Sequence, residues 1–145
     1  MTPPDGRLGI IVLDSISALG QKVSNYLSDW RTERVIAGTI QNYNGYARPD
    51  YLIPVSLPRF TSGEAKGEVK QTIRGDDIYI MLDVCNYGMT YKMSGFENVM
   101  SPDDHYQDLK RVIGAIGHKA NRINVIMPYL YEARQELRDG RESLD

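Results

Sequence analysis

The sequence predicts an α/β fold with a mainly parallel central sheet flanked by helices. A short apolar run at 8–13 is followed by apolar residues at helical spacing over 16–30. Farther along, a helical pattern that begins at Ser101 lies between two more apolar runs, at 77–84 and 123–127. Because strand, helix and strand in that order form a βαβ unit, we expect these strands to pair in parallel.

Length and composition are those of one globular domain. The chain has 145 residues, of which 41% are hydrophobic and 25% charged, and these values argue against disorder. The net charge of −2 provides no overall positive field, so we expect no nucleic-acid partner. No signal-peptide core or membrane-length apolar stretch is present, and the single cysteine, Cys85, has no partner for an internal disulfide. We therefore expect a cytoplasmic protein without a membrane partner and with a reduced, buried thiol.

Both helices show a predicted buried stripe. In the first helix the stripe comprises Leu19, Val23, Leu27 and Trp30. The second helix begins with a capping Ser101, a proline and two acidic residues, which are typical of a helix start. Its stripe comprises Leu109, Val112, Ile113 and Ile116, and Gly117 with Lys119 closes the helix.

Residues 31–58 predict an added hairpin. The Asn44-Gly45 pair is typical of a type I′ turn. Irregular strands at 35–40 and 51–57 would flank this turn, and the prolines within the second one place it at an edge.

After the predicted hairpin, the sequence predicts a short strand, a tight turn and a loop. Residues 69–73 alternate like a strand, and Arg74-Gly75-Asp76 predicts a tight turn before the strand at 77–84. The segment 85–100 has no clear period, so we expect a loop packed over the domain or a subunit contact.

The metal-binding signal is poor. His105 would share a helix face with Asp104 and Asp108, but no second group of ligands accompanies them. We therefore expect a solvated first helical turn and no metal site within this chain.

The segment after the last strand carries positive charge. The run 123–127 stops at Pro128, and Arg134, Arg138 and Arg141 follow. Ligands in open α/β sheets bind at the carboxyl ends of strands, and guanidinium groups suit phosphate. By themselves such arginines are more often a solvated tail, so the residues alone indicate an α/β domain with a candidate anion-binding edge.

Three segments together resemble the N-terminal domain of ribose-phosphate pyrophosphokinase, also called phosphoribosyl pyrophosphate synthetase. Residues 58–80, PRFTSGEAKGEVKQTIRGDDIYI, resemble the family's RF-x-x-GE loop, strand, RG turn and following strand. Residues 123–135, INVIMPYLYEARQ, resemble its strand ending in I-P-Y-x-x-x-ARQ. The opening strand and helix, with ALGQKVSNYL, fit the family's first βα unit more loosely.

The resemblance implies a phosphoribosyltransferase-like fold and an oligomeric enzyme. This enzyme moves the diphosphate of ATP onto the C1 hydroxyl of ribose 5-phosphate, with Mg²⁺ as its cofactor. Phe60 and Glu64 would help hold the adenine, in a site completed by a neighbouring subunit of a homo-oligomer. Arg134 and Gln135 would contact ATP at the head of a mobile catalytic loop.

The expected catalytic residues are Arg138 and Arg141. By the resemblance, Arg138 stands where the family has a loop Lys, and both side chains would neutralise charge during diphosphoryl transfer. Lys and Arg carry the same charge but differ in geometry.

Several residues depart from the family pattern. Ser62 replaces a common acid, Tyr131 replaces a small residue, Glu132 replaces a Tyr, and the loop after ARQ lacks the usual Arg-Lys pair. These changes leave two alternatives open: a catalytically inactive, synthetase-like regulatory or assembly subunit, and, ranked lower, a phosphoribosyltransferase relative.

The family's ribose 5-phosphate loop has paired acids followed by Thr and Gly at the end of a strand, and no such run occurs here. We therefore expect residues 1–145 to be the single N-terminal, ATP-side domain. The C-terminal ribose 5-phosphate domain would be absent from this chain, which alone would be inactive.

Overall fold

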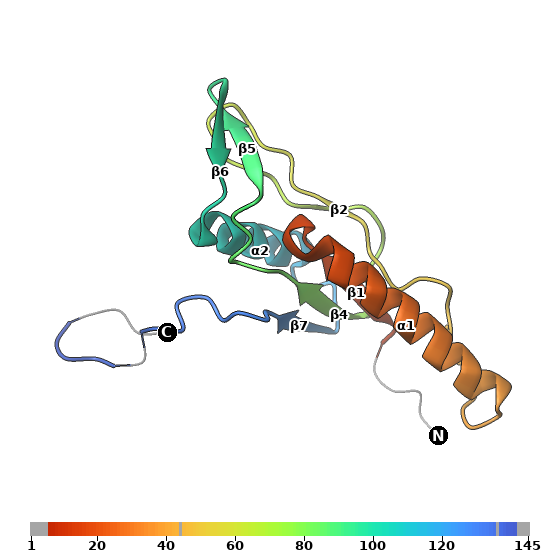
Figure 1. Ribbon diagram of the computed structural model, residues 1–145. Helices are drawn as coiled ribbons and strands as arrows, with labels where there is room; N and C mark the ends of the chain where they lie inside the picture. The colour runs from red at the N-terminus through yellow and green to blue at the C-terminus, as the bar shows by residue number, and fades with distance from the viewer. Residues whose placement is uncertain (1–5, 44, 136, 142–145) are drawn as a thin grey trace.

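A central parallel sheet organises the protein, as the computed structural model shows for residues 6–43, 45–135 and 137–141 (Figure 1). Its three strands lie in the order β1-β4-β7 and all run in parallel. The strands span Leu8–Val12, Asp77–Met81 and Arg122–Ile126. Ile10 also bridges Leu52 in parallel, which brings the segment around Leu52 alongside β1. The predicted fold class and its core strands are confirmed.

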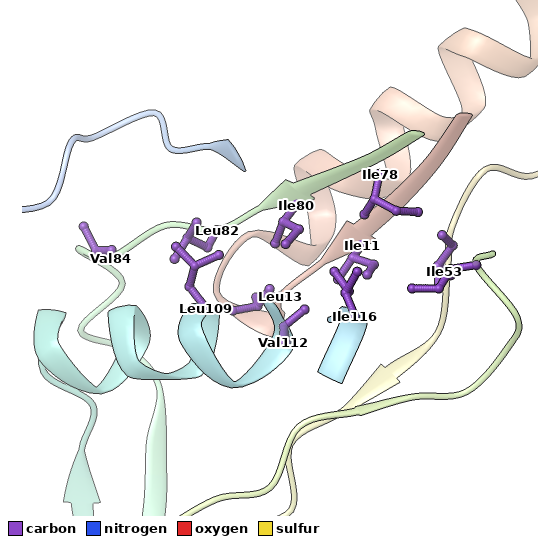
Figure 2. Packing of buried hydrophobic residues seen from close by; sticks show 11 residues of the cluster. Ile11, Leu13, Ile53, Ile78, Ile80, Leu82, Val84, Leu109, Val112 and Ile116 are labelled. Atoms are coloured by element: carbon purple, nitrogen blue, oxygen red, sulfur yellow. The ribbon is translucent and has the colours of Figure 1, made fainter. Parts of the chain in front are cut away.

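The two helices cover opposite faces of this sheet. Side chains alternate along a strand, so Ile10 and Ile11 of β1 enter different layers. Helix α1 (Ser17–Ile36) packs on the layer of Ile10, and α2 (Pro102–Ile116) packs on the layer of Ile11. Figure 2 shows the second layer, in which the α2 side chains Leu109, Val112 and Ile116 meet residues of β1 and β4.

The stripe predicted for α1 is only half correct. Leu19 and Trp30 remain 45% and 40% exposed. Gly20 and Ser24 are buried instead, and a Cβ on Gly20 would lie 2.4 Å from the side chain of Val12. Because the helix approaches β1 so closely, small residues occupy the centre of the contact, and the packed face is rotated away from the predicted one.

Helix α2 begins and ends as predicted. Ser101 accepts a hydrogen bond from the backbone N–H of Asp104, whose carboxylate accepts one from the backbone N–H of Ser101. This reciprocal pair is a capping box, which satisfies two backbone donors at the helix start. Gly117 ends the helix with a positive φ of 56°, which suits glycine.

The hairpin predicted within residues 31–58 is wrong. Residues 35 and 36 belong to α1, and none of the described residues between 37 and 54 forms a strand; Asn44 lies outside the described residues. Instead, β2 (Val55–Ser56) pairs in antiparallel fashion with β3 (Glu68–Val69). Of the strand predicted at 69–73, only Val69 lies in a strand.

The added hairpin lies at a different place, where a loop was predicted. Strands β5 (Thr90–Met93) and β6 (Phe96–Val99) pair in antiparallel fashion and project away from the sheet (Figure 1). Ser94 and Gly95 between them have φ values of 50° and 86°. A two-residue type I′ turn requires positive φ at both positions, so the Ser-Gly pair was the sequence signal for this hairpin.

Strand β7 was predicted to be buried, but its side chains are largely half-buried or exposed. Val125 and Ile126 are 43% and 40% exposed, because β7 is the edge of the sheet in the described part of the chain. Cys85 is half-buried and has no disulfide partner. Among the described helices, none is long and apolar enough to cross a membrane.

Candidate functional site

A closed loop presents Phe60 and Glu64 to solvent. The backbone N–H of Phe60 donates to the carbonyl of Glu64 at 2.8 Å, and that of Gly63 donates to the carbonyl of Phe60 at 2.9 Å. Gly63 has φ of +90°, a value that L side chains rarely adopt, so glycine is required at this turn. Phe60 is 53% exposed, and Glu64 is exposed as well.

The residue that precedes Phe60 points inward. The Arg59 Nη2 atom donates to Asp108 Oδ2 of α2 at 2.8 Å, and Nη1 donates to the carbonyl of Gly63 at 3.2 Å. Arg111 binds the other carboxylate oxygen of Asp108 at 2.6 Å. The loop is therefore attached to α2 through a largely buried set of charges.

The first turns of α2 are not solvated on the face that carries His105 and Asp108, so that prediction is wrong. The two side chains are 2% and 5% exposed. His105 Nε2 lies 2.9 Å from the carbonyl of Asn86, to which it donates in the matching tautomer. Both side chains face the domain because their positions continue the buried stripe of the helix.

Ser62, which replaces the acid of the family pattern, contacts Glu64. Its hydroxyl donates to Glu64 Oε2 at 2.9 Å. One of the two expected adenine-binding side chains is thus hydrogen-bonded within its own loop.

The other candidate segment follows β7. Arg134 is exposed and Gln135 is half-buried. The backbone N–H of Gln135 donates to the carbonyl of Glu132 at 3.0 Å, and Glu132 has a positive φ of 58°. The chain therefore turns sharply where the family pattern has a small residue followed by Tyr.

Tyr131 fastens this segment to α2. Its ring stacks on Tyr106 with centroids 4.1 Å apart and an interplanar angle of 12°. Its hydroxyl donates to Asp103 Oδ1 at 2.5 Å. The pKa of Tyr131 is raised above its ordinary value, first by this hydrogen bond to a carboxylate and then by desolvation.

The two expected catalytic arginines lie farther along the chain. Arg138 and Arg141 are both exposed, and Arg138 Nε donates to the carbonyl of Gly140 at 3.2 Å. Their guanidinium groups are open to solvent and accessible to an anionic ligand.

Two grooves accompany the segment after β7. The larger, of about 710 Å³, lies between α2 and β7 and is lined by Gln135 together with mainly apolar side chains. The second, of about 360 Å³, lies at the carboxyl ends of β4 and β7 and is lined by Arg134 and Gln135. This is the edge at which open α/β sheets bind ligands.

Within one chain, the structure does not bring Phe60 and Glu64 to these grooves. The loop that carries them packs against the β5–β6 hairpin, where the backbone N–H of Ser94 donates to the carbonyl of Thr61 at 2.8 Å. Neither groove beside Arg134 is lined by Phe60 or Glu64. The expected ATP contacts therefore form two separate pairs on a single chain.

No metal centre is assembled by the part of the chain that the structure describes. There, no three His, Cys, Asp or Glu side chains converge in a way that could hold an ion.

Sequence reasoning missed Asp108 and Tyr131 as organising residues. Asp108 lies on the helical stripe of Leu109 and Val112, and a charge on an apolar stripe indicates a buried partner. For Tyr131 the only sequence signal was its replacement of a small residue in the family pattern.

Comparisons with known proteins identify the family of the chain. A family model described as the N-terminal domain of ribose phosphate pyrophosphokinase matches residues 8–145. The chain is 28% identical over 144 residues to a ribose-phosphate pyrophosphokinase of Synechococcus elongatus, across 98% of this chain and 33% of that protein. It is 30% identical over 92 residues to ribose-phosphate pyrophosphokinase 1 of Schizosaccharomyces pombe, across 62% of this chain and 19% of that protein. The chain thus spans a third or less of the length of these curated relatives.

Proposed function

The chain belongs to the family of N-terminal domains of ribose phosphate pyrophosphokinase, and from this premise we propose that it forms the ATP-side half of such an enzyme. The intact enzyme would transfer the diphosphate of ATP to ribose 5-phosphate and so make phosphoribosyl pyrophosphate for nucleotide biosynthesis. Residues 1–145 would form the N-terminal domain, and the ribose 5-phosphate domain would lie elsewhere in the protein. A cytoplasmic location is part of the same proposal.

The loop that holds Phe60 and Glu64 carries this proposal. Its glycine turn and its attachment to α2 keep an aromatic ring and a carboxylate at the surface. A ring of this kind can stack on a purine, and a carboxylate can accept a hydrogen bond from an exocyclic amine. Both contacts suit adenine, which has a flat ring and an exocyclic amine.

The positively charged segment after β7 supplies the other half of the site. Diphosphoryl transfer needs positioning and charge neutralisation more than covalent help. We assign Arg134 and Gln135 to contacts with ATP, and Arg138 and Arg141 to neutralisation of the phosphate charge during transfer. Mg²⁺ would enter with the phosphates of ATP, because it is usually bound through substrate phosphates together with one or two carboxylates.

The separation of the two pairs of ATP contacts supports a site shared between subunits of a homo-oligomer. In such an assembly, Phe60 and Glu64 of one subunit would face the Arg134 segment of its neighbour. Each subunit would then contribute to two sites, and a single chain would complete neither.

Subunit mixing in the intact protein tests this proposal. Phe60→Ala and Arg134→Ala should each abolish ATP-dependent activity while leaving the fold intact, because both side chains are exposed. Phe96→Ala is the matched control, since Phe96 is 75% exposed on the neighbouring hairpin. An equal mixture of the two inactive variants should regain about a quarter of wild-type activity, because each hybrid dimer holds one undamaged site. No recovery after verified subunit exchange would rule out the shared site.

A second candidate function is that of a synthetase-like assembly subunit without activity. The fixed position of Tyr131 favours it, because this side chain bonds to Asp103 and stacks on Tyr106 at the head of the expected catalytic loop. The two functions differ in one product. Only the enzyme releases AMP when ATP and ribose 5-phosphate are both supplied.

A further inference from the structure

One buried guanidinium group makes three different contacts beneath the loop of Phe60 and Glu64. The Arg59 side chain is 13% exposed and pairs with Asp108, whose side chain is 8% exposed. A second nitrogen donates to the carbonyl of Gly63, and the guanidinium carbon lies 4.5 Å from the ring centroid of Tyr91 in β5. Arg59 thus joins the loop, helix α2 and the hairpin.

This combination of contacts requires the geometry of arginine. The planar fork directs one nitrogen to the carboxylate and another to the backbone, while its face stays available to an aromatic ring. A lysine could keep the ion pair but could not reach the Gly63 carbonyl at the same time.

The carboxylate partner is itself fixed in place. Asp108 Oδ2 accepts from Arg59, and Asp108 Oδ1 accepts from Arg111 at 2.6 Å, one helical turn away. Both oxygens are used, and the neighbouring Leu109 and Val112 belong to the hydrophobic core. A buried carboxylate with two cationic partners on a packed helix has a fixed position, so it can hold Arg59 in place.

We propose that Arg59 and Asp108 are positioning residues for the nucleotide base. Arg59 binds the carbonyl of Gly63, and through the closed loop it holds Phe60 and Glu64 in position before a purine binds. Neither Arg59 nor Asp108 touches the nucleotide. The inference rests on the proposed function, since it concerns how the proposed adenine contacts are held.

A fixed loop binds a base more tightly than a mobile one, because less conformational entropy is lost on binding. The base is not the reacting part of ATP, so the order of the loop that would hold it affects ground state and transition state alike. Loss of the Arg59–Asp108 ion pair should therefore raise KM for ATP and leave kcat unchanged.

The test uses the intact protein and three variants. Asp108→Asn weakens both ion pairs while keeping the shape of the side chain, and Arg59→Lys keeps only the charge. Asp76→Asn is the matched control, since Asp76 is also buried and pairs with Arg7 at 3.1 Å, but lies immediately before β4. We expect KM for ATP to rise about tenfold in Asp108→Asn, as for the loss of a charge-assisted hydrogen bond, and by a similar factor in Arg59→Lys, which loses the contact with Gly63.

A double variant separates positioning from general stability. Because Arg59 and Asp108 act through Phe60 and Glu64, Asp108→Asn should add less than its own full effect to the loss of ATP affinity already caused by Phe60→Ala. Additive losses would overturn the proposal. So would an equal rise in KM in Asp76→Asn at matched thermal stability.

The outcomes also distinguish this inference from the proposed function. If wild-type protein binds ATP and Asp108→Asn binds it equally well, only the positioning role is removed. If folded wild-type protein binds no ATP, both claims are removed.

Discussion

Tyr131 lies flat on Tyr106 and donates a hydrogen bond to Asp103, which attaches the segment after β7 to the first turns of α2. Arg59 attaches the loop of Phe60 to the same helix, through Asp108. Both candidate ATP-binding segments are therefore attached to α2, although they lie in different regions of the sequence.

The hydroxyl of Tyr131 should control how firmly the Arg134 segment is held. Tyr131→Phe keeps the aromatic stacking but removes the hydrogen bond to Asp103, so local opening becomes more frequent. We expect tryptic cleavage after Arg134 to become several-fold faster. Tyr129→Phe is the control, since Tyr129 lines the same groove. Equal cleavage rates in wild type and Tyr131→Phe would contradict the attachment.

Glu68 should make stability depend on pH in the acid range. Hydrogen bonds from Lys66, then Lys70 and Ser56, lower its pKa from 4.5 to about 2. Because the folded pKa is lowered, the stabilisation is fully present above pH 4.5 and is lost as the pH falls toward 2.

The measurement is the unfolding free energy of wild type and Glu68→Gln as a function of pH. The advantage of wild type should be constant near neutrality, shrink between the two pKa values, and weaken in about 1 M salt because the group is exposed. An advantage that persists unchanged at pH 2 would show that these contacts do not depend on the carboxylate.

Two glycines near α2 should respond to alanine in opposite ways. A Cβ on Gly67 would lie 2.6 Å from the backbone oxygen of Arg111, so β3 would have to move away from the helix. Gly114 within α2 has no atom within 4 Å of such a Cβ. We expect Gly67→Ala to lower the melting temperature, and Gly114→Ala to stabilise the protein by about 0.5–1 kcal/mol through helix propensity. Thermal unfolding of both variants measures this, and a rise for Gly67→Ala would refute the close contact.

Gly63 should be important for nucleotide affinity rather than for folding. At φ of +90°, alanine is strained, and its Cβ would lie 2.8 Å from the sulfur of Met93. Gly63→Ala should therefore displace the loop and raise KM for ATP, at a stability cost of about 1–2 kcal/mol. Gly95→Ala, at the tip of the hairpin with φ of +86° and open space around it, controls for backbone strain alone. An equal change in KM in both variants would contradict a specific role of the loop.

Local sequence signals predicted the elements that depend on neighbouring residues. The apolar runs of β1 and β4 and the cap at Ser101 act within a few positions, and each appears in the structure. The hairpin was placed wrongly because Asn44-Gly45 is a stronger turn signal than Ser94-Gly95. In the structure, however, the segments on either side of Ser94-Gly95 pair as β5 and β6, and the described residues around Gly45 form no hairpin.

Long-range relationships could not be predicted in the same way. Arg59 and Asp108 are 49 positions apart, and no local pattern links them. The expected ATP contacts came from resemblance to a family, and their separation on one chain followed only from the three-dimensional arrangement. The rotated face of α1 likewise depends on how closely Gly20 approaches Val12.

Release of AMP from ATP tests the central claim most directly. The intact protein is incubated with ATP and Mg²⁺, with and without ribose 5-phosphate, and AMP is quantified. We predict AMP formation that requires ribose 5-phosphate, is lost in Phe60→Ala and Arg134→Ala, and persists in Phe96→Ala. Folded, self-associating protein that releases no AMP under these conditions would contradict the enzyme and favour the assembly subunit.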